Sequence, residues 1–442
     1  MHMENTLNRR KRVLLMGINF SPELTGIGKY SGEMIDWLSK NNYDCTVVSS
    51  FPYYPNWEVQ KPHKARFYKK EIANDGHLTL YRCPLYVPKK PTGAKRILHD
   101  ASFFITAFFM VFCLLFKKGN DYIFCIAPPF HLGFLGVFYK FFKGGKLVCH
   151  IQDLQIEAAR DLQIIKSNTA FKVLFGLESF ILKRADYISS ISSGMIEKIA
   201  RKVNTEVIYF PNWVDTESFF PISKTAELKK RWGFKSSDKI VLYSGSIGEK
   251  QGLETLIPIA KDLGQQESIK LVICGDGPYK QDLIRLSDQE GLTNMLFLPL
   301  QPMQDFNAFL NITDIHLVLQ KKSACDLVMP SKLTTIWSAG GLALITAERN
   351  SSLRNLVLEH DMAVVIDCED QEALKSAILS CCQDNNKAKR INARHYAKSF
   401  LSKDSILQKM VATLERTAFP LENVPTAVPR SSIDRQAVAA TG

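Results

Sequence analysis

The chain has 442 residues, 46% of them hydrophobic and 23% charged, and this composition excludes a disordered or fibrous protein. The length suggests two domains, each large enough for its own core. The formal net charge of +12 favours phosphorylated ligands or anionic lipid as partners, whereas nucleic acid is not expected because the lysines and arginines form no long tract. Ten cysteines without a C-x-x-C pair or a metal-binding spacing indicate reduced thiols in a cytosolic protein.

The first half of the chain predicts an alternation of buried strands and helices. Strands are expected at 13–16, 46–49, 78–82, 122–126, 146–150, 187–191 and 207–210, and helices at 29–40, 132–142 and 169–184. This alternation indicates an α/β fold with a parallel, doubly wound sheet, whose ligands bind beyond the carboxyl ends of the strands. The loops at those ends are 17–28, 127–130 and 150–157.

The longest apolar run, 101–116, has about 16 residues and is shorter than the roughly 20 that span a bilayer. Lysines flank it on both sides. Two interpretations remain open, a buried core helix and a helix that lies at the membrane face. The N-terminal residues are basic, but polar residues soon interrupt the apolar run that follows, so no signal peptide is predicted.

The second half predicts a similar series of strands after a connection at 211–238. Strands are expected at 240–243, 270–273, 295–298, 315–319, 343–346 and 363–366, and 388–417 is mostly helical. We therefore divide the chain into a first domain at 1–215 and a second at 216–395. A helix at 396–420 is expected to cross back to the first domain, and 421–442 to form a disordered tail.

A strand, a glycine turn and a helix are predicted in succession over residues 240–256. Such a turn presents free backbone N–H groups to an anion, and Gly245, Ser246 and Gly248 would form it. Lys250 adds a positive charge where a phosphate would lie. The alternative is an ordinary strand-to-helix turn. The chain contains neither a G-x-G-x-x-G fingerprint nor a D-x-D motif, so no metal-bound diphosphate is indicated.

Two further groups of polar residues are candidates for binding. His150 ends a predicted strand and is followed by Asp153, so it could bind a hydroxyl group in a cleft; a core histidine is the alternative. Asp326, Ser331 and Lys332 precede a predicted helix, where Ser331 suits the N-cap position. This loop could hold a diphosphate, or it could be a plain helix cap.

Taken together, these motifs resemble the family 4 glycosyltransferases, the retaining enzymes of the GT-B fold, and most closely the colanic acid and exopolysaccharide biosynthesis type. The resemblance covers roughly residues 12–415, and it rests on the order and spacing of six stretches. They are SPELTGIGKYSGEM (21–34), RCPLYVPKKP (82–91), HIQD (150–153), FPNWVD (210–215), LYSGSIGEKQGLE (242–254) and MPSKLT (329–334).

The resemblance implies roles for individual residues. Gly26 and Gly28 match the loop that meets the acceptor and the donor phosphates, and His150 matches the sugar site. Gly275 and Gly277 match a G-x-G-P turn below the nucleotide. The segment 326–333, which begins at Asp326, matches the loop of the family's E-x7-E motif.

The sequence also departs from the family pattern. Ser246 stands where the family usually has an arginine, and Lys250 lies one position before the usual lysine. Thr335 replaces the second glutamate, which holds the ribose in many members. Lys332 is a candidate to supply the charge that Ser246 lacks.

The implied activity is transfer of a sugar with retention by a hexosyltransferase of two Rossmann-like domains, the first for the acceptor and the second for the nucleotide sugar. The donor would be a nucleoside diphosphate sugar, with GDP-fucose suggested, and no cofactor or metal is expected. The acceptor would be a polyprenyl-diphosphate-linked saccharide at the anionic cytoplasmic face of the inner membrane. A nucleotide-sugar epimerase of the same fold and a non-catalytic scaffold are the alternatives. Donor hydrolysis with and without acceptor separates the three.

Overall fold

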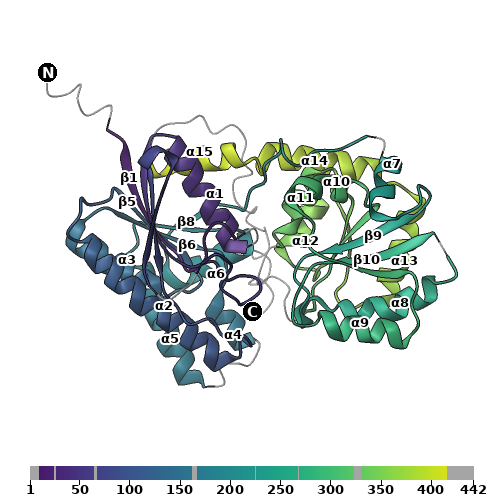
Figure 1. Ribbon diagram of the computed structural model, residues 1–442, viewed down its shortest axis with the longest axis horizontal. Coiled ribbons are helices and arrows are strands. Elements are labelled where there is room, and N and C mark those ends of the chain that lie inside the picture. The colour runs from purple at the N-terminus through teal and green to yellow at the C-terminus, as the bar shows by residue number, and fades with distance from the viewer. Residues whose placement is uncertain are drawn as a thin grey trace, which may run out of the picture.

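The computed structural model describes residues 9–23, 26–63, 67–161, 167–223, 225–266, 268–322 and 330–415. It contains two α/β domains side by side, each built on one sheet (Figure 1). The prediction of two Rossmann-like, doubly wound domains is therefore confirmed.

The N-terminal sheet has eight strands in the order β3-β4-β2-β1-β5-β6-β7-β8. They are β1 (Lys11–Met16), β2 (Tyr43–Ser50), β3 (Lys69–Ala73), β4 (Leu78–Cys83), β5 (Tyr122–Ala127), β6 (Lys146–Ile151), β7 (Tyr187–Ser190) and β8 (Val207–Tyr209). The helices are α1 (Gly26–Lys40), α2 (Gly93–Leu114), α3 (Leu132–Lys143), α4 (Gln155–Asp161), α5 (Asn168–Leu182) and α6 (Ser193–Val203). All pairings are parallel except β3 with β4, which is antiparallel.

The sequence did not predict β3. Its residues KKEIA are half-exposed or exposed throughout, so they show no alternation of buried and polar positions. An edge strand of this kind is defined by its pairing with β4 rather than by its own pattern.

The C-terminal sheet has six strands in the order β11-β10-β9-β12-β13-β14, all parallel. They are β9 (Lys239–Ser244), β10 (Ile269–Cys274), β11 (Met295–Leu298), β12 (Ile315–Val318), β13 (Ala343–Thr346) and β14 (Val364–Ile366). The helices are α7 (Thr225–Lys229), α8 (Leu256–Leu263), α9 (Lys280–Gln289), α10 (Met303–Asn311), α11 (Lys332–Ser338), α12 (Ser352–Glu359) and α13 (Gln371–Gln383).

The helix expected directly after the glycine turn begins later than predicted. Two short 3-10 turns, Glu249–Gln251 and Leu253–Thr255, come first, and Gly252 between them has a left-handed φ of +63°. A regular helix cannot pass through such a residue, so α8 starts at Leu256. The connection at 211–238 also contains α7, which the sequence left without structure.

Two helices at the end of the described chain join the domains along one side (Figure 1). In α14 (Lys387–Phe400), Ala393 and Tyr396 belong to a core of the C-terminal domain. In α15 (Lys403–Glu415), Ile406 and Met410 lie in a core of the N-terminal domain. The predicted tail, 421–442, lies outside the described residues.

Helix α2 is only partly a core helix. Its buried residues follow one stripe, His99, Phe103, Ala107, Val111 and Leu114, against the N-terminal sheet. The opposite face exposes Leu98, Ile105, Phe109 and Phe112. By length and composition α2 could cross a membrane, and 28% of its most apolar window is buried.

Candidate active site

Two glycine turns of the C-terminal domain pack backbone against backbone. Gly245 donates its N–H to Cys274 O at 3.0 Å, and Ile247 donates to Asp276 O at 2.9 Å. A Cβ atom on Gly275 would lie 1.9 Å from the Gly245 carbonyl oxygen, and one on Gly277 would lie 2.2 Å from that of Ile247. No side chain fits there, so Gly275 and Gly277 hold the turn that carries Gly245, Ser246 and Gly248.

A buried ammonium group lies against this turn. The Lys332 Nζ atom, on the first residue of α11, is 3.4 Å from the position of a Cβ on Gly245. It is buried without a hydrogen-bond partner among the described residues, and burial lowers the pKa of Lys332 to about 7. An ammonium group has three N–H donors, and leaving them unpaired in the interior is unfavourable. The arrangement is therefore suited to an anion such as a diphosphate.

The other residues predicted at the start of α11 differ in how their polar groups are placed. Ser331 occupies the N-cap position, but its side chain makes no capping hydrogen bond, which corrects the expectation of a side-chain cap. Thr335 is buried, and its hydroxyl donates to Lys332 O at 2.9 Å within the helix. Asp326 lies outside the described residues.

Lys250 and Asp153 face one another from the two domains. Lys250 is exposed in the 3-10 turn Glu249–Gln251. Asp153 follows β6, and its Oδ1 atom is buried without a hydrogen-bond partner among the described residues. Burial raises the pKa of Asp153, and the positive charge of Lys250 opposes that rise. The interaction brings Lys250 of the C-terminal domain near Asp153 of the N-terminal domain, and Lys250 is exposed whereas Lys332 is enclosed.

His150 is enclosed within the N-terminal sheet. It is 3% exposed, its Nδ1 atom lies 3.0 Å from Ser189 Oγ on the neighbouring strand, and its ring packs edge-on against Phe210. Burial lowers the pKa of His150 to about 3, so the ring is neutral at physiological pH. Since Nδ1 is engaged by Ser189, only Nε2 remains to contact a sugar hydroxyl.

The predicted loop before α1 is built around a buried carboxylate that the sequence did not single out. Glu23 Oε1 accepts hydrogen bonds from the N–H groups of Tyr53 and Tyr54, at 3.0 and 2.9 Å, and burial raises the pKa of Glu23. A Cβ on Gly28 would lie 2.5 Å from Glu23 Oε2. Gly26 starts α1 with φ of +60°. The one available signal was an acidic residue within a glycine-punctuated loop.

The amino-terminal part of α1 reaches the C-terminal domain. Tyr30 on α1 is buried, packs edge-on against Trp213, and its hydroxyl interacts with Thr334 on α11. Gly26 and Gly28, predicted in a loop, thus belong to the first turn of α1, which lies on the side of the N-terminal domain that faces Lys332; Figure 1 shows α1 pointing toward the C-terminal domain. Within the described ranges, no three His, Cys, Asp or Glu side chains come together in a way that could hold a metal ion.

Comparison with known sequences identifies a matching family model and two relatives, one of which aligns with most of the chain. The family model "Glycosyl transferases group 1" matches residues 224–398. The chain is 37% identical over 410 residues to the colanic acid biosynthesis glycosyl transferase WcaI of Escherichia coli K12, an alignment that covers 90% of this chain and 98% of that protein. It is also 22% identical to a GDP-mannose-dependent alpha-mannosyltransferase of Corynebacterium glutamicum, over 62% of this chain and 60% of that one.

Solved structures share the architecture at low sequence identity. Sucrose-phosphate synthase from Thermosynechococcus elongatus superposes with a TM-score of 0.71 at 14% identity, over 92% of this chain and 99% of that one. HepE from Anabaena, in complex with UDP and glucose, has a TM-score of 0.65 at 13% identity and covers 92% and 100%. WaaG, a glycosyltransferase involved in lipopolysaccharide biosynthesis, has a TM-score of 0.64 at 14% identity and covers 91% and 99%. At these identities the likeness concerns the fold alone.

Proposed function

Because the chain belongs to the group 1 glycosyl transferases and has the GT-B fold, we propose that it transfers a sugar in polysaccharide biosynthesis of the colanic acid type. The donor is a nucleoside diphosphate sugar, and the reaction retains the anomeric configuration. The observation that carries the proposal is the buried Lys332 ammonium, which lies beside the Gly245 turn and has no hydrogen-bond partner among the described residues. The positive charge that a diphosphate would need is thus already in position before a diphosphate binds.

Lys332 stabilises the leaving group in this proposal. As the glycosidic bond breaks, the sugar acquires oxocarbenium character and negative charge grows on the departing diphosphate. A positive group already held in a low-dielectric site stabilises that charge without reorganisation. Lys250, which is exposed, and the loop of Asp326 act as secondary contacts, and His150 positions the sugar through Nε2.

The proposed acceptor is a polyprenyl-diphosphate-linked saccharide, which the enzyme meets at the cytoplasmic face of the inner membrane. The support is the apolar face of α2, together with the lysines that flank it at Lys90, Lys95, Lys117 and Lys118. A helix with one face against the domain and an exposed aromatic face suits insertion into the headgroup region. The protein is thus a peripheral membrane enzyme that keeps both domains in the cytoplasm.

For the donor we propose GDP-fucose. The support is the resemblance to enzymes of the colanic acid type and the guanosine nucleotide named for the C. glutamicum relative. The test is turnover of GDP-fucose, GDP-mannose and UDP-glucose with a lipid-linked acceptor, with the anomeric configuration of the product read by NMR. GDP-fucose is expected to be consumed fastest, and retention to be observed.

The same assay separates the alternatives. A transferase consumes donor faster when the acceptor is present. An epimerase converts the donor without an acceptor, and a scaffold leaves the donor intact in both conditions. Either of the last two results would exclude the proposed function.

A further inference from the structure

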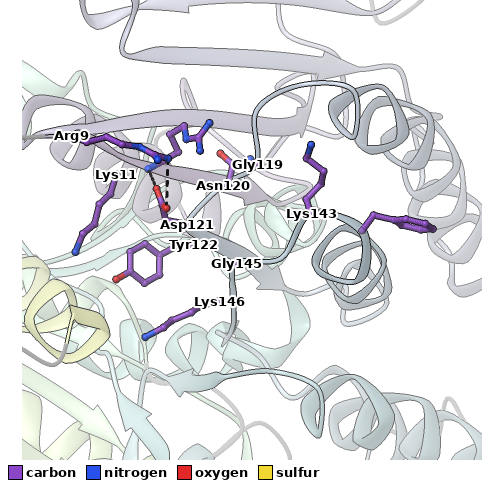
Figure 2. Close-up of a pocket in the computed structure, with 11 residues that line it drawn as sticks. Arg9, Lys11, Gly119, Asn120, Asp121, Tyr122, Lys143, Gly145 and Lys146 are labelled. Atoms are coloured by element: carbon purple, nitrogen blue, oxygen red, sulfur yellow. Dashed lines mark hydrogen bonds and ion pairs between the residues drawn. The ribbon is translucent and has the colours of Figure 1, made fainter. Parts of the chain in front are cut away.

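A basic pocket lies at the edge of the N-terminal sheet where the strands begin, and Figure 2 shows the residues that line it. Its volume is about 650 Å³, and Lys11, Tyr122 and Lys146, the first residues of β1, β5 and β6, line it. The strands are parallel, so their amino ends share one edge, whereas Asp153 and the loop of Gly28 follow their carboxyl ends. The glycosyl-transfer site therefore does not account for this pocket.

The positive charge of the pocket is largely uncompensated. Five cationic side chains line it, Arg9, Lys11, Arg12, Lys143 and Lys146, with one carboxylate, Asp121. Lys11 is paired with Glu415 at 2.7 Å, and Lys146 lies 3.3 Å from the Tyr187 hydroxyl. Asp121 uses Oδ2 to accept the Arg12 backbone N–H at 2.7 Å, and its Oδ1 lies 3.9 Å from Arg9.

Two cationic groups of the lining keep N–H donors that no described residue accepts. The Arg12 Nε atom is buried and has no hydrogen-bond partner among the described residues. For Lys143, the described part of the chain offers no hydrogen bond or ion pair. A guanidinium and an ammonium group held at one cavity match the oxygens of a phosphate group, which accepts several charge-assisted hydrogen bonds.

Exposed aromatic rings border the pocket. Phe142 lines it, and the adjacent Phe141 is 81% exposed. Just past the end of α2, Phe116 is 79% exposed, and the chain then enters the pocket lining at Gly119. The ligand site is thus polar inside and apolar at its rim. A free phosphorylated solute would need only the polar interior, whereas a lipid would use the polar interior for its headgroup and the apolar rim for its chains.

We propose that this pocket binds the phosphate headgroup of an anionic phospholipid while the rings at its rim enter the bilayer. The proposal deepens the membrane association proposed above, because it names the group that is bound and its place. Helix α2 is about 33 Å long, given 22 residues at about 1.5 Å each, and it ends beside the pocket. One lipid held there fixes the orientation of the exposed α2 face on the membrane.

The test uses monomeric dihexanoyl phosphatidylglycerol, kept below its micelle concentration, with hydrogen exchange as the readout. We expect protection of the segments 119–122 and 144–146 in the native protein. The double variant Arg12→Gln/Lys143→Gln should bind the lipid about tenfold more weakly or worse, because the two cations that would meet the phosphate are lost. The matched control is Lys90→Gln/Lys95→Gln, which removes two lysines at the other end of α2 and should keep the protection.

Other outcomes overturn the proposal. Equal protection by inorganic phosphate alone would assign the pocket to a soluble phosphorylated ligand. Undiminished lipid binding by the pocket variant, or no protection by the lipid, would exclude a headgroup site. Donor hydrolysis measured on the same samples should be unchanged in both variants, since the pocket lies away from the glycosyl-transfer site. A failure of the lipid proposal is thereby distinguishable from a failure of the proposed function.

Discussion

The Lys332 Nζ atom lies over the ring of Tyr243, 3.7 Å from the centroid of that ring. The hydroxyl of the same tyrosine donates a hydrogen bond to Ser246 O at 2.6 Å. One side chain thus fixes both the ammonium group and the glycine turn beside it. The face of an aromatic ring attracts an ammonium group less strongly than an anion does. The Tyr243 ring therefore positions the Lys332 ammonium but leaves its N–H groups able to bind an anion.

The first prediction concerns the leaving group. Lys332→Met keeps much of the side-chain volume but removes the charge, and it should lower kcat and kcat/KM together by about 10²- to 10³-fold. Lys250→Ala should cost much less, because Lys250 is exposed. Lys322→Met, an exposed lysine of the same domain, is the control. Near-native turnover of Lys332→Met with the same donor would show that Lys332 does not stabilise the leaving group. A defect confined to Lys250→Ala would assign that role to Lys250.

The second prediction is a pH dependence of donor affinity. Burial sets the pKa of Lys332 at about 7 in the free protein, and a bound diphosphate should raise it. Above pH 7 binding must therefore take up a proton, and affinity should fall by up to about tenfold per pH unit. Isothermal titration calorimetry in buffers of different ionisation enthalpy measures that proton. In Lys332→Met this uptake should vanish, and its persistence would point to another group.

The third prediction tests the backbone contact between the glycine turns. Gly275 has φ of +150°, and its added Cβ would lie 1.9 Å from the Gly245 carbonyl oxygen. Gly275→Ala should therefore destabilise the protein by about 3 kcal/mol or more and disturb donor binding. Gly176→Ala is the control, since it lies in α5 with no atom near an added Cβ, and it should stabilise by up to about 1 kcal/mol. Equal unfolding midpoints for the two variants in urea would contradict the steric argument.

The fourth prediction tests whether His150 contacts the donor sugar or serves only as a core residue. His150→Ala should lower turnover far more than nucleotide affinity if Nε2 contacts the sugar. Ser189→Ala removes only the hydrogen bond to Nδ1, so it should lower stability by about 1 kcal/mol and leave most of the turnover. Parallel loss of turnover and of nucleotide affinity in His150→Ala would show that the histidine is a core residue only.

The fifth prediction concerns the exposed face of α2. Phe109→Ser/Phe112→Ser should weaken binding to vesicles of phosphatidylcholine and phosphatidylglycerol, because two aromatic rings no longer enter the headgroup region. Phe220→Ser, at an exposed ring of the C-terminal domain, should have no effect. Binding should also weaken as salt rises, since the flanking lysines are exposed. Co-sedimentation at low and physiological salt measures both, and unchanged binding of the α2 variant would reject this face.

The alternation of strands and helices in both domains, and the positions of the candidate functional loops, could be predicted from the amino-acid sequence. Strand and helix periodicity is local, and a glycine turn after a buried strand is visible in a few letters, as at Gly245 and Gly275. The sequence also marked Lys332 as a substitute for the charge missing at Ser246. Because neighbouring parallel strands end at one edge of a sheet, the order of these motifs placed them on one side of each domain.

Which of these groups are buried became known from the folded structure. Lys250 follows a glycine turn and Lys332 begins a helix, and both are lysines in candidate phosphate-binding loops, yet Lys332 is buried over Tyr243 and Lys250 is exposed. The apolar periodicity of α2 could not say which face the sheet would cover. The basic pocket joins Arg12 to Lys143 across 131 positions of the chain, since 143 − 12 = 131. Whether a side chain is buried, and whether its charge is paired, depends on residues that are distant in the sequence and become neighbours only on folding. A local sequence pattern therefore cannot predict either property.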